Sequence, residues 1–161
     1  MGKPRILWVE DSARFELANL LGPIYASNKY ELVLAEDATT AARYLQTVPF
    51  DAVIMDIRIP PGRDRQWSQK YERAGSDKAS AQLGLALLFW LFHSNGKKPP
   101  EWARPEKFAV FSVEEKYEIG PSLERLGILI CEEKRPGLRD TVLLDLIQTV
   151  LQYSNGHAQR K

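Results

Sequence analysis

The amino-acid sequence predicts an α/β fold, a doubly wound sandwich in which helices cover both faces of one five-stranded parallel sheet. Short apolar segments of strand length recur five times along the chain, and segments with helical apolar spacing separate them. This alternation is typical of right-handed βαβ units, whose strands lie parallel. The third apolar segment, residues 50–55, is followed closely by Asp56 and Pro60, as expected for a buried parallel strand that ends in a loop.

The composition is ordinary for a single globular domain. The 161 residues are 44% hydrophobic and 27% charged, with a net charge of +1, so no basic field indicates nucleic-acid binding. The single cysteine, Cys131, excludes an internal disulfide and fits a reducing compartment. We find no signal peptide and no apolar run near the roughly 20 residues that span a bilayer. A cytoplasmic protein without a membrane span is therefore expected.

Each strand is predicted from a short apolar run that ends in a polar or turn-forming residue. The first run, Arg5–Val9, ends in two acids, and the second ends before Glu36 and Asp37. The fourth run ends in Ser112. We expect the five strands at residues 5–9, 30–35, 50–55, 107–111 and 127–131.

The helices are predicted between the strands, where apolar residues lie three or four apart. Gly22–Pro23 is expected to end the first helix, and Gly120–Pro121 to shorten, kink or split the fourth. The third helix is apolar nearly all round, so it needs cover on more than one face. The expected ranges are 13–21, 38–47, 83–92, 113–125 and 138–153, which gives a domain of residues 1–153 and a flexible polar tail at 154–161.

One segment, residues 61–82, interrupts the pattern. It is polar and lacks apolar periodicity, so we interpret it as an inserted loop with room for a short helical turn near residues 67–73. Trp67 and Tyr71 lie four residues apart and could anchor the segment to a surface. Two hypotheses remain open: a solvated loop without a role, and a lid or partner-docking segment.

Polar side chains follow the predicted strands at one edge of the sheet. Glu10 and Asp11 follow the first strand, Asp56 the third and Ser112 the fourth, and Lys134 lies near the end of the fifth. The carboxyl ends of parallel strands share an edge, so these groups should converge. Three carboxylates suit Mg²⁺, and Asp56 could attack phosphorus to give an aspartyl-phosphate. The ammonium, the hydroxyl and the metal would neutralise the phosphoryl oxygens.

This ordered set resembles the receiver domain of two-component response regulators, which are CheY-like. The matching segments are residues 9–12, 55–60, 84–88 and 110–112, together with Lys134. The resemblance implies the flavodoxin-like strand order 2-1-3-4-5 and Asp56 as the phosphoacceptor. It also implies a Mg²⁺ site formed by Glu10, Asp11, Asp56 and the backbone carbonyl of Arg58, with Ser112 and Lys134 contacting the phosphoryl group.

By this resemblance the protein is a stand-alone receiver in phosphorelay signal transduction rather than a conventional enzyme. It would accept its phosphoryl group from a sensor histidine kinase or a phosphotransfer protein. It would then signal to a downstream protein through a changed surface formed by the fourth helix, the fifth strand and the fifth helix. Nucleic acid is not an expected partner. A homodimer is possible, because the third and fifth helices are apolar.

Several positions depart from the receiver pattern. Val113 replaces a very small residue beside the hydroxyl and could crowd phosphate access, and Cys131 replaces the aromatic residue that rotates on activation. The sequence Lys134-Arg135-Pro136 replaces a Lys-Pro step, so the cis peptide expected there could be shifted or absent. Arg58 and Glu114 flank the site and are expected to form an exposed ion pair of modest energy.

Three other functions are compatible with an α/β fold of this kind. A pseudo-receiver would use the same fold as a phosphorylation-independent interaction module, with the insert and Val113 closing the pocket. A dehalogenase-like phosphatase generally requires an acidic residue two positions after the nucleophile. This chain has Arg58 at that position, which disfavours such a phosphatase. A dinucleotide-binding protein is disfavoured, because no Gly-x-Gly-x-x-Gly motif follows the first strand.

Overall fold

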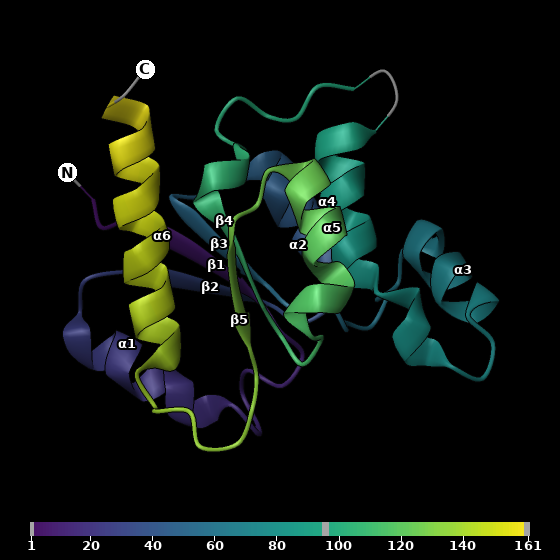
Figure 1. The fold of residues 1–161 in the computed structure, drawn as a ribbon, viewed down its shortest axis with the longest axis horizontal. Helices are drawn as coiled ribbons and strands as arrows, with labels where there is room; N and C mark the ends of the chain where they lie inside the picture. Colours follow the sequence, from purple (N-terminus) through teal and green to yellow (C-terminus); the bar gives the residue numbers. More distant parts are fainter. Residues whose placement is uncertain (1, 95–96, 160–161) are drawn as a thin grey trace.

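A computed structural model describes residues 2–94 and 97–159 of the chain. Its centre is a parallel sheet of five strands in the order β2-β1-β3-β4-β5, which confirms the predicted fold class and strand order (Figure 1). The observed strand bounds are β1 Arg5–Val9, β2 Glu31–Ala35, β3 Ala52–Met55, β4 Phe108–Ser112 and β5 Ile130–Glu133.

Helices cover both faces of the sheet, because side chains alternate along each strand and every buried strand is apolar on both sides. Leu7 and Val9 of β1 belong to the core on one face, and Ile6 and Trp8 to the core on the other. The first face is covered by α2 (Ala38–Thr47), α4 (Leu83–His93) and α5 (Lys116–Leu126), and the second by α1 (Leu21–Ser27) and α6 (Val142–Gln159) (Figure 1).

The segment after β1 differs from the prediction. Residues 11–17 form turns, a short 3₁₀ helix covers Ala18–Leu20, and α1 begins only at Leu21. Gly22–Pro23 therefore lies in the first turn of α1 and does not end a helix. Proline fits there because the first-turn amides have no intrahelical acceptor. The helix ends instead at Asn28, whose φ of 54° is left-handed.

The ends of two later helices and one strand also differ. The helix α5 continues through Pro121, whose ring faces solvent together with Tyr117, so water can donate to the Tyr117 carbonyl that the proline leaves free. Gly127 ends α5 with a φ of 79°, so β5 starts later than expected. The helix α6 begins at Val142 and reaches Gln159, beyond the expected end at residue 153, and buries Ser154.

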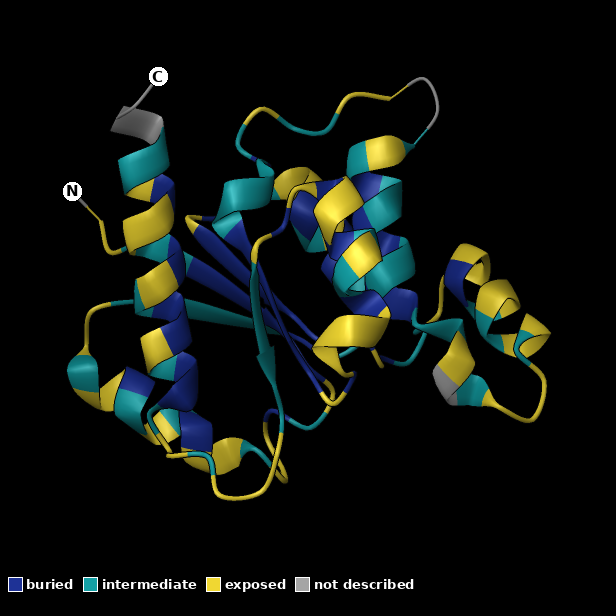
Figure 2. Cartoon of the chain, viewed as in Figure 1, coloured by how far each residue is buried: buried dark blue, intermediate teal, exposed yellow. Residues whose placement is uncertain are grey.

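The insert is more structured than a polar loop. It contains α3 (Arg65–Arg73) and a 3₁₀ helix at Lys78–Ala81. Trp67 is the one fully buried side chain of α3 and packs edge-to-face against Trp90 of α4, with ring centroids 5.6 Å apart. Figure 2 shows α3 otherwise largely exposed beside α4. The insert thus covers part of the apolar α4, so it is not a loop that is solvated throughout.

A hydrogen-bonded clamp holds the start of the insert against α2. The Thr39 hydroxyl donates to the Pro61 carbonyl at 2.8 Å and accepts the Asp64 amide at 2.9 Å. Gly62 has a φ of 76°, and a Cβ there would lie 2.6 Å from the Asp37 carboxylate. Only glycine fits this turn, so the insert leaves β3 along one fixed path. Within the described residues, no helix is long and apolar enough to cross a membrane.

Candidate functional site

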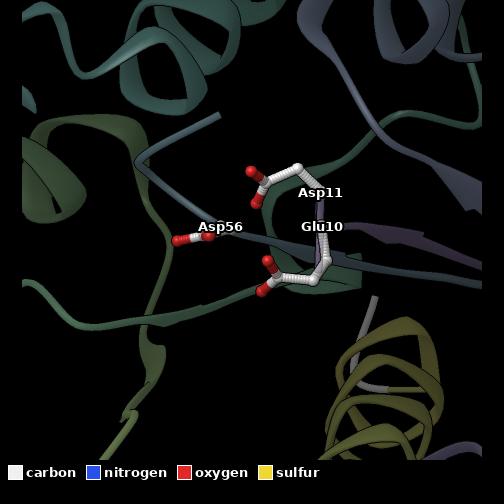
Figure 3. Close-up of side chains that lie close together, drawn as sticks. All are labelled: Glu10, Asp11 and Asp56. Carbon is white, nitrogen blue, oxygen red and sulfur yellow. The ribbon is translucent and has the colours of Figure 1, made fainter. Parts of the chain in front are cut away.

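The three predicted acids meet at the carboxyl edge of the sheet. Strands β1 and β3 are neighbours with Val9 paired to Met55, so Glu10 and Asp56 leave the sheet side by side. One carboxylate oxygen from each of Glu10, Asp11 and Asp56 lies within 4.8 Å of the others. Figure 3 shows the Glu10 and Asp11 carboxylates pointing from the end of β1 toward Asp56. Such a cluster of hard oxygen donors suits a divalent cation such as Mg²⁺.

Lys134 follows the edge strand β5 and brings a positive charge to this cluster. Its backbone amide donates to the Ser112 carbonyl at 2.8 Å, which fixes the residue directly after β5. Its ammonium donates to Asp56 Oδ2 at 2.9 Å and to the Glu10 carboxylate. The long side chain thus spans β4 and joins groups from the first, third and fifth strands.

The burial of these charges shifts their protonation equilibria. Glu10 is 1% exposed, and this burial raises the pKa of its carboxyl from 4.5 to about 7, with a further contribution from the Asp56 charge and opposition from Lys134. Burial alone would lower the pKa of Lys134, but Asp56 and Glu10 together raise it above its ordinary value. Lys134 therefore stays charged at neutral pH, while Glu10 binds a proton readily when no metal is present.

Replacing this acid should change how stability depends on pH. In a metal chelator, the unfolded chain loses the Glu10 proton near pH 4.5 and the folded chain near pH 7, so wild-type stability falls as pH rises between these values. The uncharged variant Glu10→Gln avoids that loss. We expect Glu10→Gln to gain up to ~3 kcal/mol over wild type at about pH 8 and nothing below about pH 4.5.

Urea unfolding at both pH values measures this difference. The exposed acid in Glu16→Gln provides the matched control, which should follow wild type at both pH values. A gain for Glu10→Gln that is equal at both pH values would contradict the linkage to Glu10 ionisation.

The remaining predicted residues border the cluster. Ser112 is buried, and its Oγ accepts the Glu114 amide at 3.3 Å. The Arg58 amide donates to Asp56 Oδ1 at 3.3 Å, and its Nε donates to Glu114 Oε1 at 2.7 Å. The expected exposed pair is wrong in one respect: the Glu114 side chain is 4% exposed, whereas that of Arg58 is 48% exposed. Glu114 lies two residues after Ser112, the buried last residue of β4, whereas Val113 between them is 48% exposed.

Comparisons with known structures agree on the architecture. A protein from Vibrio parahaemolyticus described as a Luxo repressor has a signal receiver domain whose crystal structure matches with a TM-score of 0.64 and 16% identity, covering 99% of this chain and 98% of that chain. A CheY-like response regulator receiver domain from Methanospirillum hungatei matches with a TM-score of 0.62 and 17% identity, covering 97% and 99%. The HemR receiver domain from Leptospira biflexa matches with a TM-score of 0.56 and 20% identity, covering 92% and 94%.

The chain has the fold of response regulator receiver domains. No protein-family model matches the sequence, and no curated protein sequence is significantly similar to it. The likeness thus rests on three-dimensional arrangement at low identity, and it shows the fold alone.

The departures from the receiver pattern also have definite places in the structure. The Val113 side chain is 48% exposed. Cys131 lies half-buried in β5, and this burial raises the pKa of its thiol. No peptide bond in the described part of the chain is cis, so the bond before Pro136 is trans.

Sequence reasoning missed the contribution of the insert to this edge of the receiver fold. Tyr71, Lys78 and Gln82 line a cavity of about 190 Å³ whose other walls include Asp11 and Arg58. The segment offers no periodicity and no motif that would place these side chains. The aromatic pair Trp67 and Tyr71 was the signal that the sequence offered, and it indicates that the segment docks rather than what the docked segment faces.

Proposed function

We propose that the protein works as a receiver in phosphorelay signal transduction, with Asp56 accepting a phosphoryl group from a sensor histidine kinase or a phosphotransfer protein. The observation that carries this proposal is the arrangement around Asp56: a 4%-exposed carboxylate that shares its edge with two further acids and accepts from the Lys134 ammonium at 2.9 Å. The receiver fold supports it independently.

The metal that we propose for this site is Mg²⁺, and the three carboxylates of the cluster fit it. Glu10, Asp11 and Asp56 would hold the ion, and the Arg58 carbonyl would complete the set. Burial and the Asp56 charge disfavour the charged form of Glu10, and a cation bound at the cluster would favour it. When bound, Mg²⁺ neutralises the acids and the phosphoryl oxygens and holds the donor in place.

The chain's own groups then carry the transfer. A carboxylate oxygen of Asp56 attacks phosphorus, and the bond from phosphorus to the donor atom breaks as the electron pair leaves with the donor. The Lys134 ammonium, already beside Asp56, can pair with a phosphoryl oxygen as negative charge builds there. The Ser112 hydroxyl accepts only the Glu114 amide among the described residues, so its own hydrogen is free to donate to the phosphoryl group.

Output is proposed to be a protein contact rather than a reaction on a substrate. Drawing Ser112 toward the new phosphoryl group would move the segment that leads into α5. Behind that segment, α5 and β5 form a cavity of about 400 Å³ that includes Cys131, and Tyr117 and Leu129 on its rim are exposed apolar residues. This face is where we expect a downstream protein to distinguish the two states.

Intact mass after incubation with phosphoramidate and Mg²⁺ tests the proposal. Wild type should gain one phosphoryl mass, and the gain should disappear in Asp56→Asn and in excess chelator. The control Asp145→Asn removes an exposed aspartate of α6 and should behave as wild type. No added mass in wild type, together with failure of beryllofluoride to shift its unfolding, would instead favour a phosphorylation-independent interaction module.

A further inference from the structure

The cavity between the insert and the acidic cluster is a second binding feature of this edge. It measures about 190 Å³, enough for a small organic group but not for a nucleotide. Asp11 belongs both to the acidic cluster and to the cavity wall, so the two are directly joined. The insert supplies the facing side through Tyr71, Lys78 and Gln82.

The two cations of the cavity differ in their partners. The Arg58 guanidinium is already paired with the buried Glu114. The half-buried Lys78 ammonium donates to the Tyr71 carbonyl at 3.1 Å and lies 5.1 Å from the centre of the Tyr71 ring. Within the described residues it has no carboxylate within 4.0 Å. Its charge is thus the uncompensated one, and an anion is its natural complement.

The insert that carries Lys78 is anchored to the body of the protein, and the Lys78 ammonium itself donates to the Tyr71 carbonyl. Trp67 buries the inner face of α3 against α4, and the Thr39 clamp fixes the start of the insert. At its far end the insert enters α4 through Gln82, which also lines the cavity. A group positioned in this way loses little entropy when it binds a ligand.

We propose that this cavity receives the leaving group of a small acyl phosphate and that Lys78 stabilises the carboxylate released there, an inference that rests on the phosphoacceptor function proposed for Asp56. As the Asp56 oxygen bonds to phosphorus, the bond between phosphorus and the acyl oxygen breaks. The electron pair stays on that oxygen, so the donor leaves as a carboxylate anion and no proton is required. In an in-line displacement the negative charge develops on the acyl oxygen, on the side of phosphorus opposite the attacking Asp56 oxygen. Lys78 is the cation that the adjoining cavity can offer to this charge.

Phosphoryl donors with different leaving groups distinguish assistance to the leaving group by Lys78 from a defect at the phosphoacceptor site. Acetyl phosphate releases an anion, whereas phosphoramidate releases ammonia, because its nitrogen already carries the needed proton. Lys78 should therefore assist the first reaction and not the second. Both donors place the same phosphoryl group against Asp56, Lys134 and the metal, so a defect at the acceptor would slow both alike.

The experiment compares phosphorylation rates by intact mass with acetyl phosphate and with phosphoramidate, in Mg²⁺ at matched ionic strength. Lys78→Gln should slow the acetyl phosphate reaction about five-fold and leave the phosphoramidate rate unchanged. Lys78→Arg keeps the charge and should retain most of the rate. Lys70→Gln removes an exposed lysine of α3 outside the cavity and should match wild type.

Each alternative outcome is informative. An equal loss with both donors, or no loss with either, overturns the role of Lys78 and leaves Asp56 as acceptor. Failure of wild type with both donors overturns the phosphoacceptor function and this inference with it. Circular dichroism checks the fold of each variant, and Lys78→Met provides the same contrast if Lys78→Gln does not fold.

Discussion

Replacing Gly84 with alanine is expected to destabilise the protein by at least ~3 kcal/mol, because α4 approaches the site with no room for a side chain. A Cβ on Gly84 would lie 1.9 Å from the Asp56 carbonyl oxygen and 2.8 Å from Ile57 Cα. Both are backbone atoms of the segment that follows β3, so neither can rotate away. The Gly84 amide also donates to the Ile57 carbonyl at 2.9 Å, which ties the helix to that segment.

Urea unfolding of wild type and Gly84→Ala measures the loss. Gly120→Ala in α5 is the matched control, since it too is a helical glycine but has no atom within 4 Å of an added Cβ. Alanine at that position should be neutral or stabilising by up to ~1 kcal/mol. If Gly84→Ala lowered the free energy of unfolding by less than ~1 kcal/mol, α4 could move away from the segment after β3 at little energetic cost, which would contradict this account. In any variant that still folds, the displaced Asp56 should be phosphorylated more slowly.

Lys134→Met is expected to cost about 3 kcal/mol of stability in chelator at about pH 8, because it leaves two nearly buried carboxylates without their shared cation. Glu10 and Asp56 both bond to the Lys134 ammonium, and their mutual repulsion would then be unopposed by it. The cost should shrink toward pH 6, since Glu10 takes up a proton near pH 7 in the folded chain even when Lys134 is present.

Adding Mg²⁺ distinguishes this account from a simple loss of packing. The ion should stabilise Lys134→Met more than it stabilises wild type, because it replaces the missing positive charge at the same acids. Lys29→Met, which removes an exposed lysine far from the cluster in sequence, should show neither effect. If Mg²⁺ stabilised wild type and Lys134→Met equally, the acids around Lys134 would not form the metal site.

The parallel sheet and its edge could be predicted because each depends on short-range patterns. Apolar runs give the strands, and a parallel register brings the residue after each strand to one edge. Given the strand order that the receiver resemblance implies, the strand ends at Val9 and Met55 are enough to expect Glu10 beside Asp56. No comparable pattern exists for Gly22–Pro23, which is equally compatible with the end of one helix and the first turn of the next.

The features that escaped prediction depend on contacts between distant segments. The insert is mostly polar, and two aromatic side chains of α3, the buried Trp67 and the partly buried Tyr71, pack against the core of the protein. The burial of Glu114, next to the exposed Val113 and paired with the distant Arg58, does not follow from the sequence around it. The continuation of α6 past residue 153 occurs beyond its apolar stripe, and a hydrophobic pattern cannot signal such an extension.

The edge-to-face pair of Trp67 and Trp90 has a spectroscopic consequence. One indole belongs to the insert and the other to α4, so their relative orientation records whether the insert is seated. Two aromatic chromophores at 5.6 Å interact strongly enough to shape the near-ultraviolet circular dichroism of a folded protein. The chain therefore contains an intrinsic optical reporter of the contact between α3 and α4, and the seating of the insert can be followed without attaching a label.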